Sequence, residues 1–275
     1  MRIILRVPDS SAVQHDELVG FYDESYAREG EQAQLYSRWR ALGAKGKADH
    51  VVELCARAGV NPASTLEVGC GDGALLCELS RRGFGGSLHG VEITTAAVEI
   101  ASKRKEISSV EMYDGKRLRC GGGAYDLGIV SHVLEHVPDP VDLLAEVGRV
   151  CGAMIVEVPL EDNLSASRAG KREHAQEVGH LRRLSRDSAR AIVSQAGMRI
   201  AGELEDPLPL AAHRFFAETP TAKLAAACKW GTRRGLHLLA PPLARRLFTV
   251  HYACLCLPPA GRVGAQSTGA VNDDG

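Results

Sequence analysis

The stretch Leu66-Glu67-Val68-Gly69-Cys70-Gly71-Asp72-Gly73 decides the fold of this 275-residue chain. The residues from Thr65 to Val68 form a short apolar and β-branched run that is typical of a buried strand, and three glycines follow at alternate positions. From Ala74 to Arg82 the leucines recur at helical spacing, and Gly83 stands just beyond. The pattern predicts a strand, a glycine turn and a helix, whose backbone can lie against a nucleotide-type ligand.

The spacing of the glycines narrows the choice of ligand. A dinucleotide-binding turn has the pattern Gly-x-Gly-x-x-Gly, whereas here the third glycine comes one residue early. Glu67 also stands two positions before the first glycine, where an anion disfavours a pyrophosphate and favours a cationic ligand. These features disfavour a nicotinamide oxidoreductase, and they leave an ordinary strand-to-helix turn without a ligand as the structural alternative.

The segment Glu67-Val-Gly-Cys-Gly-Asp-Gly73 resembles the first motif of the class I S-adenosylmethionine-dependent methyltransferases, in particular their small-molecule type 11 and type 23 branch. The resemblance covers about Tyr22 to Glu205. It implies that S-adenosylmethionine is the cofactor. It also implies that the turn holds the methionine end of that cofactor, through Glu67, Gly69, Cys70, Gly71 and Gly73.

Two further strand ends carry candidate cofactor residues. The run from Ser87 to Glu92 predicts a second strand, and an acid at its tip can accept hydrogen bonds from both ribose hydroxyls. Glu92, followed by Ile93, is therefore the strongest cofactor candidate. A third strand is predicted over residues 110–114, and the resemblance implies that Asp114 and Gly115 lie against adenine. An Asp-Gly pair is also a common turn signal, and both interpretations stay open.

A fourth strand, predicted over residues 125–131, leads into His132-Val-Leu-Glu135-His136-Val-Pro138. Read alone, His-x-x-Glu-His is the motif of an inverted zinc protease. That chemistry needs a helix presenting both histidines, and Pro138 stands only two residues beyond the second one. No metal site is expected here. The resemblance implies instead that Ser131 and His132 contact the cofactor, and that Glu135 and His136 face the transferable methyl as catalytic candidates.

The rest of the strand and helix pattern predicts the sheet. A helix opening near Pro140 and a fifth strand over residues 153–159 continue the alternation, which predicts an α/β, doubly wound, Rossmann-like sheet of seven strands. A long polar connection follows over residues 160–184. Its end resembles the segment that returns over the pocket in this family, so His180 is a further catalytic candidate. Ser185 is expected to cap the next helix and Gly197 to close it.

The amino-terminal region is rich in aromatic residues although aromatics make up only 5% of the chain. The resemblance implies that helices here cover the cofactor and supply part of the acceptor pocket. The alternative is that these side chains only pack helices onto the sheet. The candidate acceptor-binding residues are Tyr22, Tyr26, Tyr36 and Trp39.

Before the last strand, residues 219–248 contain six arginines and lysines and no acid, interleaved with leucines. This segment is expected either to cap the sheet with a solvated basic face or to contact a membrane surface or other anionic partner. The domain organisation follows from these segments. We expect an amino-terminal helical cap at 1–60, a methyltransferase domain at 61–257 with a helical insertion at 206–247, and a disordered tail at 258–275.

Composition limits the function further. The net charge is −1 and the eight cysteines include no Cys-x-x-Cys pair, which favours a cytoplasmic protein with reduced thiols and no nucleic-acid partner. No apolar run approaches about 18 residues. We expect methyl transfer to a small-molecule acceptor, with oxygen, nitrogen and carbon all open as the acceptor atom. The alternatives are a membrane-associated lipid or quinone methyltransferase and a protein that binds the cofactor without transferring methyl.

Overall fold

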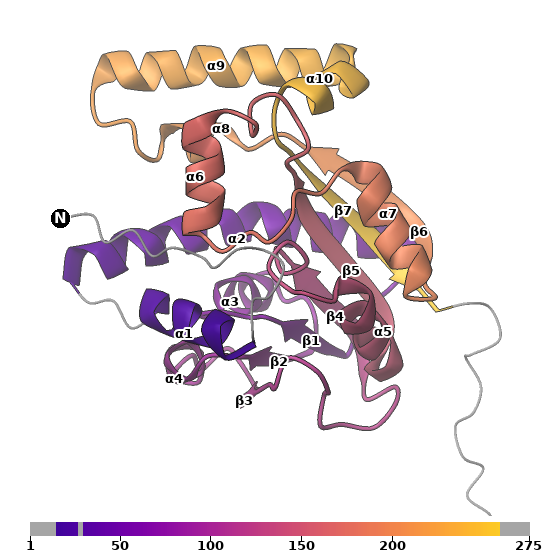
Figure 1. Ribbon diagram of the computed structural model, residues 1–275. Coiled ribbons are helices and arrows are strands. Elements are labelled where there is room, and N and C mark those ends of the chain that lie inside the picture. Colours follow the sequence, from indigo (N-terminus) through magenta and orange to yellow (C-terminus); the bar gives the residue numbers. More distant parts are fainter. Residues whose placement is uncertain (1–14, 27–29, 259–275) are drawn as a thin grey trace, which may run out of the picture.

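The computed structural model describes residues 15–26 and 30–258, and its centre is a seven-stranded sheet flanked by helices (Figure 1). The strand order is β3-β2-β1-β4-β5-β7-β6. The strands up to β5 are parallel, whereas β7 runs antiparallel to both β5 and β6. The strands are β1 Ser64–Val68, β2 Ser87–Glu92, β3 Ser109–Met112, β4 Tyr125–Ser131, β5 Cys151–Leu160, β6 Arg199–Asp206 and β7 Val250–Leu257. The predicted doubly wound sheet is therefore confirmed.

Helices cover both faces of the sheet, and β5 alternates its side chains between them. Ile155 lies in one apolar cluster with Leu54 and Leu76, whereas Val156 lies in the other with Leu144 and Val193. The helices of the first face are α2 Gly30–Ala58 and α3 Ala74–Arg81, and those of the second are α5 Pro140–Val150 and α7 Arg186–Gln195. The alternation places the next residue of β5, Glu157, on the same face as α2.

Two local predictions about helix ends hold. The Ser185 hydroxyl accepts from the backbone N–H of Ser188 at 3.1 Å, and the Ser188 hydroxyl accepts from the N–H of Ser185 at 2.8 Å. This reciprocal pair begins α7. Gly197 follows the helix with a φ of +76°, a conformation that favours glycine.

The connections outside this sheet hold helices as well. The helix α1 (His15–Tyr26) contacts α4 (Thr95–Ala101) through a hydrogen bond, in which the Ala96 N–H donates to Asp23 Oδ1 at 2.9 Å. The polar connection at 160–184 is not one extended loop, since α6 (Ala169–Glu177) lies within it. The insertion between β6 and β7 consists of α8 Leu210–Arg214, α9 Pro220–Leu239 and α10 Pro241–Leu247, at the top of Figure 1.

Some predictions fall partly or wholly outside the described residues. The beginning of the predicted amino-terminal cap, residues 1–14, and the predicted tail after Pro258 are not described. Within the described ranges, no helix is long and apolar enough to cross a membrane.

Candidate active site

The glycine turn after β1 is tight and has close neighbours. Gly69, Gly71 and Gly73 have φ angles of +73°, +54° and +75°, in the left-handed region that favours glycine. A Cβ atom on Gly71 would collide with the Tyr26 hydroxyl, and one on Gly69 would lie 2.8 Å from Val133 Cγ2. The backbone path and the neighbouring side chains therefore both require glycine here.

Glu92 lies at the tip of β2, beside this turn, and is 7% exposed. Its Oε2 accepts from the Gly71 N–H at 2.9 Å, and its Oε1 accepts from the Ile93 N–H at 2.7 Å. Burial raises the pKa of this carboxyl, and the backbone hydrogen bonds oppose that shift. An ionised carboxylate has about four acceptor positions, so Glu92 can hold the turn and still accept from a ligand's hydroxyls.

The helix α1 covers the turn through Tyr26. The Arg40 guanidinium lies 4.9 Å from the centre of the Tyr26 ring, and Arg40 Nε donates to Asp72 Oδ2 at 2.8 Å. Burial, followed by the charge of Glu92, raises the pKa of Tyr26 far above its usual value, so the phenol stays protonated. The structure therefore places Tyr26 over the predicted cofactor turn, although the sequence interpretation assigned it to the acceptor.

The other predicted cofactor residues near the turn are buried. Glu67 is 4% exposed, and burial raises its pKa to about 8 while Lys47 opposes the shift. The Cys70 side chain belongs to the apolar cluster under α2 and α3, so only its backbone can face a ligand. Ser131 is 5% exposed, and its hydroxyl has no hydrogen-bond partner within the described ranges.

The Asp114 side chain stabilises a turn in this structure. Its Oδ1 accepts from the backbone N–H groups of Lys116 and Arg117, both at 2.8 Å, and Gly115 has a φ of +75°. The side chain is exposed. These contacts match the turn interpretation of the Asp-Gly pair, while contact with adenine stays a prediction.

The three predicted catalytic residues meet in what we call the His136 cluster: Glu135, His136 and His180. Their ligand-type atoms all lie within 4.8 Å of one another. The rings of His136 and His180 are 4.7 Å apart between centroids, and His136 Nε2 is 3.9 Å from Glu135 Oε1. The cluster thus brings two residues that follow β4 into contact with His180, which lies near the end of the 160–184 connection.

The other contacts of His136 fix the role of its ring nitrogens. The Tyr22 hydroxyl lies 2.5 Å from His136 Nδ1 and donates to the Val178 carbonyl at 3.3 Å. His136 Nδ1 is also 3.1 Å from the Gly179 carbonyl. Because the Gly179 carbonyl can only accept, its contact with Nδ1 assigns the hydrogen to that nitrogen, and Nε2 keeps its lone pair. Tyr22 therefore orients a predicted catalytic residue.

Burial sets the charge of the His136 cluster. Burial and the neighbouring His180 lower the pKa of His136 to about 3, so its imidazole is neutral at pH 7. Burial raises the pKa of Glu135 to about 7. Burial also lowers the pKa of His180, but Glu161 Oε2, 2.7 Å from His180 Nδ1, outweighs it and the pKa is raised.

Backbone and arginine contacts hold the returning segment against β4. The Leu181 N–H donates to the Glu135 carbonyl at 2.8 Å. The Arg182 guanidinium donates to the carbonyls of Leu134 at 3.1 Å and Pro138 at 2.7 Å. These contacts join residues more than 40 positions apart in the sequence, which no local sequence pattern pairs.

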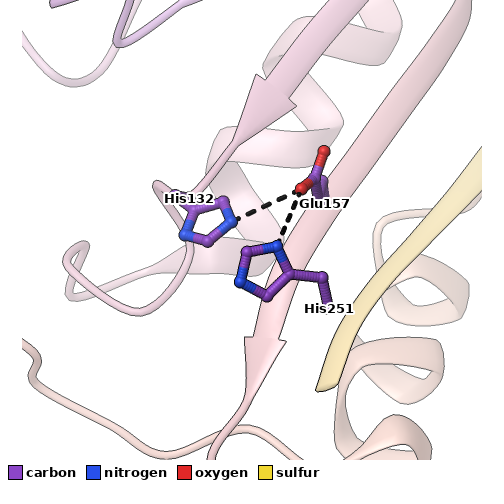
Figure 2. A group of neighbouring side chains, drawn as sticks. All are labelled: His132, Glu157 and His251. Atoms are coloured by element: carbon purple, nitrogen blue, oxygen red, sulfur yellow. Dashed lines mark ion pairs between the residues drawn. The ribbon is translucent and has the colours of Figure 1, made fainter. Parts of the chain in front are cut away.

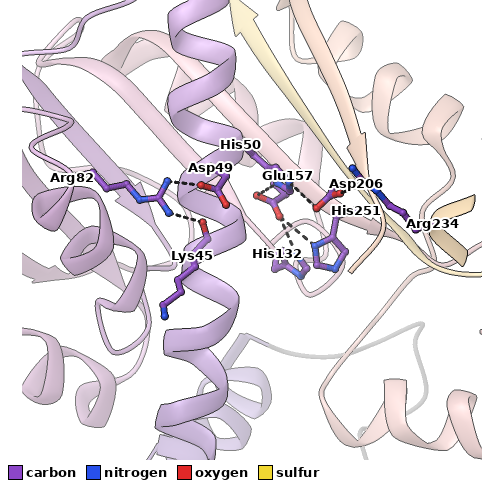
Figure 3. A network of polar contacts seen from close by, with 9 residues as sticks. All are labelled: Lys45, Asp49, His50, Arg82, His132, Glu157, Asp206, Arg234 and His251. Atoms are coloured by element: carbon purple, nitrogen blue, oxygen red, sulfur yellow. Dashed lines mark hydrogen bonds and ion pairs between the residues drawn. The ribbon is translucent and has the colours of Figure 1, made fainter. Parts of the chain in front are cut away.

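A second group, the Glu157 cluster, consists of His132, Glu157 and His251 (Figure 2). Glu157 Oε1 lies 3.5 Å from both His132 Nε2 and His251 Nδ1. His50 of α2 lies beside the cluster, with Nδ1 3.4 Å from Glu157 Oε2 and Nε2 3.6 Å from Asp206 Oδ2 (Figure 3). Sequence reasoning assigned His132 to the cofactor and missed the others.

The histidine pair of the His-x-x-Glu-His segment is therefore divided between two clusters. His132 faces Glu157 and His136 faces His180. The segment from His132 to Pro138 forms turns rather than a helix. This agrees with the argument against a protease-type helix motif.

The remaining aromatic candidates lie elsewhere in the described ranges. Trp39 packs against Phe215 and Phe216 at the insertion, with ring centroids 5.1 and 5.5 Å apart. Tyr36 is 41% exposed on α2. The structure brings neither residue into the two clusters, and their assignment to the acceptor stays a prediction.

A comparison with protein families agrees with this geometry. A family model described as a methyltransferase domain matches residues 36–201. A ubiquinone biosynthesis O-methyltransferase of Actinobacillus pleuropneumoniae serotype 5b (strain L20) is 30% identical over 88 residues. That alignment spans 29% of this chain and only 37% of the relative.

Solved structures share the fold at low sequence identity. Geranyl diphosphate C-methyltransferase of Streptomyces coelicolor A3(2) superposes with a TM-score of 0.56 at 13% identity, over 77% of this chain and 78% of that one. Magnesium protoporphyrin IX methyltransferase of Synechocystis PCC 6803 gives a TM-score of 0.53 at 16% identity, over 89% of this chain and 97% of that one.

Proposed function

The chain belongs to this methyltransferase family, and from that premise we propose that it transfers the methyl group of S-adenosylmethionine to a small-molecule acceptor. The observation that carries the proposal is the convergence of the glycine turn, Glu92 and the His136 cluster at the carboxyl ends of β1, β2 and β4. Ligands of open α/β sheets bind at this edge. The acceptor atom is left open by these residues.

The residues around the turn suit this cofactor. The buried Glu92 carboxylate can accept from ribose hydroxyls, and the glycines let a ligand lie on the backbone. Burial raises the pKa of Glu67 to about 8, and a cationic ligand beside the turn would lower it and stabilise the ionised carboxylate. S-adenosylmethionine, when bound, supplies an electrophilic methyl on a sulfonium that leaves as a neutral thioether.

The His136 cluster can prepare the acceptor. His136 Nε2 carries a lone pair and is positioned by Tyr22 and Gly179, so it can take the proton that the acceptor loses as it attacks. Burial holds the pKa of the His136 imidazole at about 3, so proton uptake depends on the Glu135 carboxylate, whose Oε1 lies 3.9 Å away and can stabilise the imidazolium that forms. Burial of the cluster excludes water, which favours alignment of the two reactants.

Two measurements test the proposal in turn. Isothermal titration should show binding of S-adenosylmethionine and S-adenosylhomocysteine to the purified chain. A radiolabelled-methyl screen over hydroxyl, amine and activated-carbon acceptors should then find transfer. Binding without transfer to any acceptor would favour a non-catalytic member of the fold, and absence of binding would contradict the cofactor assignment.

A specific feature of α9 supports a membrane-surface role as a second proposal. Every residue of α9 is at least partly exposed, including Leu224 at 65%, Leu238 at 66% and Leu239 at 88%. Lys223 and Lys229 form no ion pair with any described residue, whereas Arg234 and Arg245 are paired with Asp206 and Glu205. Exposed leucines beside unpaired cations suit an anionic lipid surface and an acceptor dissolved in it.

Sedimentation with vesicles of phosphatidylcholine and phosphatidylserine tests this role. Binding should fall steeply with salt and with the Leu238→Ser/Leu239→Ser double variant. The paired Arg234 and Arg245 should matter less than Lys223 and Lys229, because their charges are already neutralised by acids. Lack of binding at low salt would leave α9 as a cap on the sheet.

A further inference from the structure

Glu157 is a fully buried carboxylate without a hydrogen bond. It is 0% exposed, and neither of its oxygens has a hydrogen-bond partner among the described residues. A buried ionised carboxylate is costly unless it is paired at close range or coordinates a metal. Its ion-pair partners among the described residues are histidine nitrogens at 3.4 to 3.5 Å, further away than the 2.7–2.9 Å that is typical of a charge-assisted hydrogen bond.

The spacing of these atoms matches the coordination sphere of a metal ion. Histidine and carboxylate ligands lie about 2.0–2.2 Å from a tetrahedral Zn²⁺, which puts neighbouring ligand atoms about 3.4 Å apart. Glu157 Oε1 is 3.5 Å from His132 Nε2 and 3.5 Å from His251 Nδ1. All three ligand atoms lie within 4.8 Å of one another, so one ion could contact them once the histidine side chains adjust.

The backbone prepares this arrangement. The three residues come from the neighbouring strands β5 and β7 and from the residue that follows β4. The His132 N–H donates to the Glu157 carbonyl at 2.9 Å. His132 has a φ of +57°, and among the described residues it is the only one other than glycine with a positive φ. Strain of this kind is concentrated at functional sites.

We propose that His132, Glu157 and His251 bind a divalent transition-metal ion such as Zn²⁺ through Nε2, Oε1 and Nδ1. Two histidines and one carboxylate form a ligand set that leaves coordination positions open to water or another ligand. The side chains of His132 and His251 are 24% and 19% exposed, which gives the ion a path from solvent. This site departs from the sequence-based expectation that no metal is bound.

His50 and Asp206 complete the surroundings of the ion. His50 Nδ1 faces Glu157 Oε2, and its Nε2 faces Asp206 Oδ2. His50 therefore lies against the second oxygen of Glu157 and leaves Oε1 for the ion. Arg234 donates to Asp206 at 3.1 Å and extends the network to α9 (Figure 3). Such outer contacts orient metal ligands.

The His136 cluster is the less suitable of the two neighbouring groups. His136 Nδ1 is engaged by Tyr22 and Gly179, and His180 Nδ1 lies 2.7 Å from Glu161. The carboxylate oxygens of both Glu135 and Glu157 lack a hydrogen-bond partner within the described chain, so the two clusters differ in their histidines: in the Glu157 cluster, His132 Nε2 lacks a partner as well. A metal in the Glu157 cluster would lie beside the predicted methyl-transfer site. A role for this ion in binding the acceptor rests on the proposed function.

Metal titration of the full chain tests the site. Chelator-treated protein should bind one equivalent of Co²⁺ with a visible absorption spectrum, and Zn²⁺ should displace it in competition with a chelator. His251→Ala and Glu157→Gln should each weaken the affinity by about a hundredfold or more, since loss of an outer contact alone costs 10–100-fold. His180→Ala is the matched control from the neighbouring cluster and should retain binding.

Two control measurements separate loss of the metal site from loss of the fold or of cofactor binding. Far-UV circular dichroism and S-adenosylhomocysteine affinity establish that each variant is folded, and that loss of metal is separate from failure of the proposed function. A spectrum dominated by thiolate charge-transfer bands would assign the ion to cysteines. That result, the absence of stoichiometric binding, or binding lost in His180→Ala but kept in His251→Ala would overturn the proposal.

Discussion

The two halves of the candidate site are built in different ways. The cofactor half lies within one β1-α3-β2 unit, where Glu92 accepts from the backbone of Gly71. The acceptor half draws Tyr22 from α1, His136 from the end of β4 and His180 from the far side of α6. The first half depends on backbone conformation, and the second depends on side chains brought together by the whole fold. A substitution should therefore affect binding in the first half and turnover in the second.

The strongest test of the cofactor half is Gly71→Val. A branched side chain at a φ of +54° is strained, and its Cβ would collide with the Tyr26 hydroxyl. We expect isothermal titration to detect no S-adenosylmethionine binding. Gly231→Val on α9, where nothing lies within 4 Å of the added Cβ, is the control and should bind normally. Normal affinity in folded Gly71→Val would remove the turn from the cofactor site.

The corresponding test of the acceptor half is His136→Ala. If His136 takes the acceptor's proton, kcat should fall by about a hundredfold while S-adenosylhomocysteine affinity stays constant. His89→Ala on β2, where the ring contacts Ser109 at 2.8 Å, is a control outside the cluster. Reduced stability with unchanged kcat of the folded fraction would mean that His136 only holds the segment around Gly179. Full kcat in both His136→Ala and His180→Ala would indicate catalysis by alignment alone.

A smaller effect is expected from Glu92→Ala. The loss of a buried carboxylate that can accept two hydroxyls should weaken S-adenosylmethionine binding by roughly 1 to 3 kcal/mol. The Gly71 N–H also loses its acceptor, so part of this effect comes from the turn itself. Glu111→Ala on β3 removes an exposed carboxylate and should leave affinity unchanged. Unchanged affinity in Glu92→Ala would argue against its ribose role.

The same contrast explains what the sequence could predict. The glycine turn and the strand ending at Glu92 are local patterns, and both were predicted with their strands. The family resemblance drawn from Glu67 to Gly73 is confirmed by the methyltransferase-domain match. Local sequence is enough to predict the strands and the turn of this half, because these features follow from residues next to one another in the chain, while the cofactor roles of the residues stay predictions.

The Glu157 cluster could not be predicted in this way. His132, Glu157 and His251 meet only because β5 lies between β4 and β7, an order set by crossover connections rather than by neighbouring residues. Sequence offered a weak signal, since Glu157 interrupts the apolar run from Met154 to Val158. Trp39 is a second residue whose surroundings the sequence did not predict. Its aromatic character gave no indication that it packs against Phe215.

The smallest expected effect concerns how the acceptor half is held together. His180 and Glu161 form an ion pair with side-chain exposures of 13% and 19%. Because the pKa of His180 is raised in the folded protein, the charged pair stabilises the fold fully below the unfolded pKa of about 6.5. The contribution is lost as the pH rises through the raised folded pKa. Glu161→Gln should therefore lower the free energy of unfolding by about 1 kcal/mol at pH 6 and by less at pH 9.

Urea unfolding at both pH values measures this difference. Glu203→Gln is the matched control, because its partner Arg186 at 2.8 Å keeps its charge throughout the range, so the cost of that variant should stay nearly constant. A cost of Glu161→Gln that does not change with pH would mean that His180 is neutral and that hydrogen bonding alone holds the segment. A cost that decreases with pH would show that charge holds the acceptor half together, whereas backbone geometry holds the cofactor half.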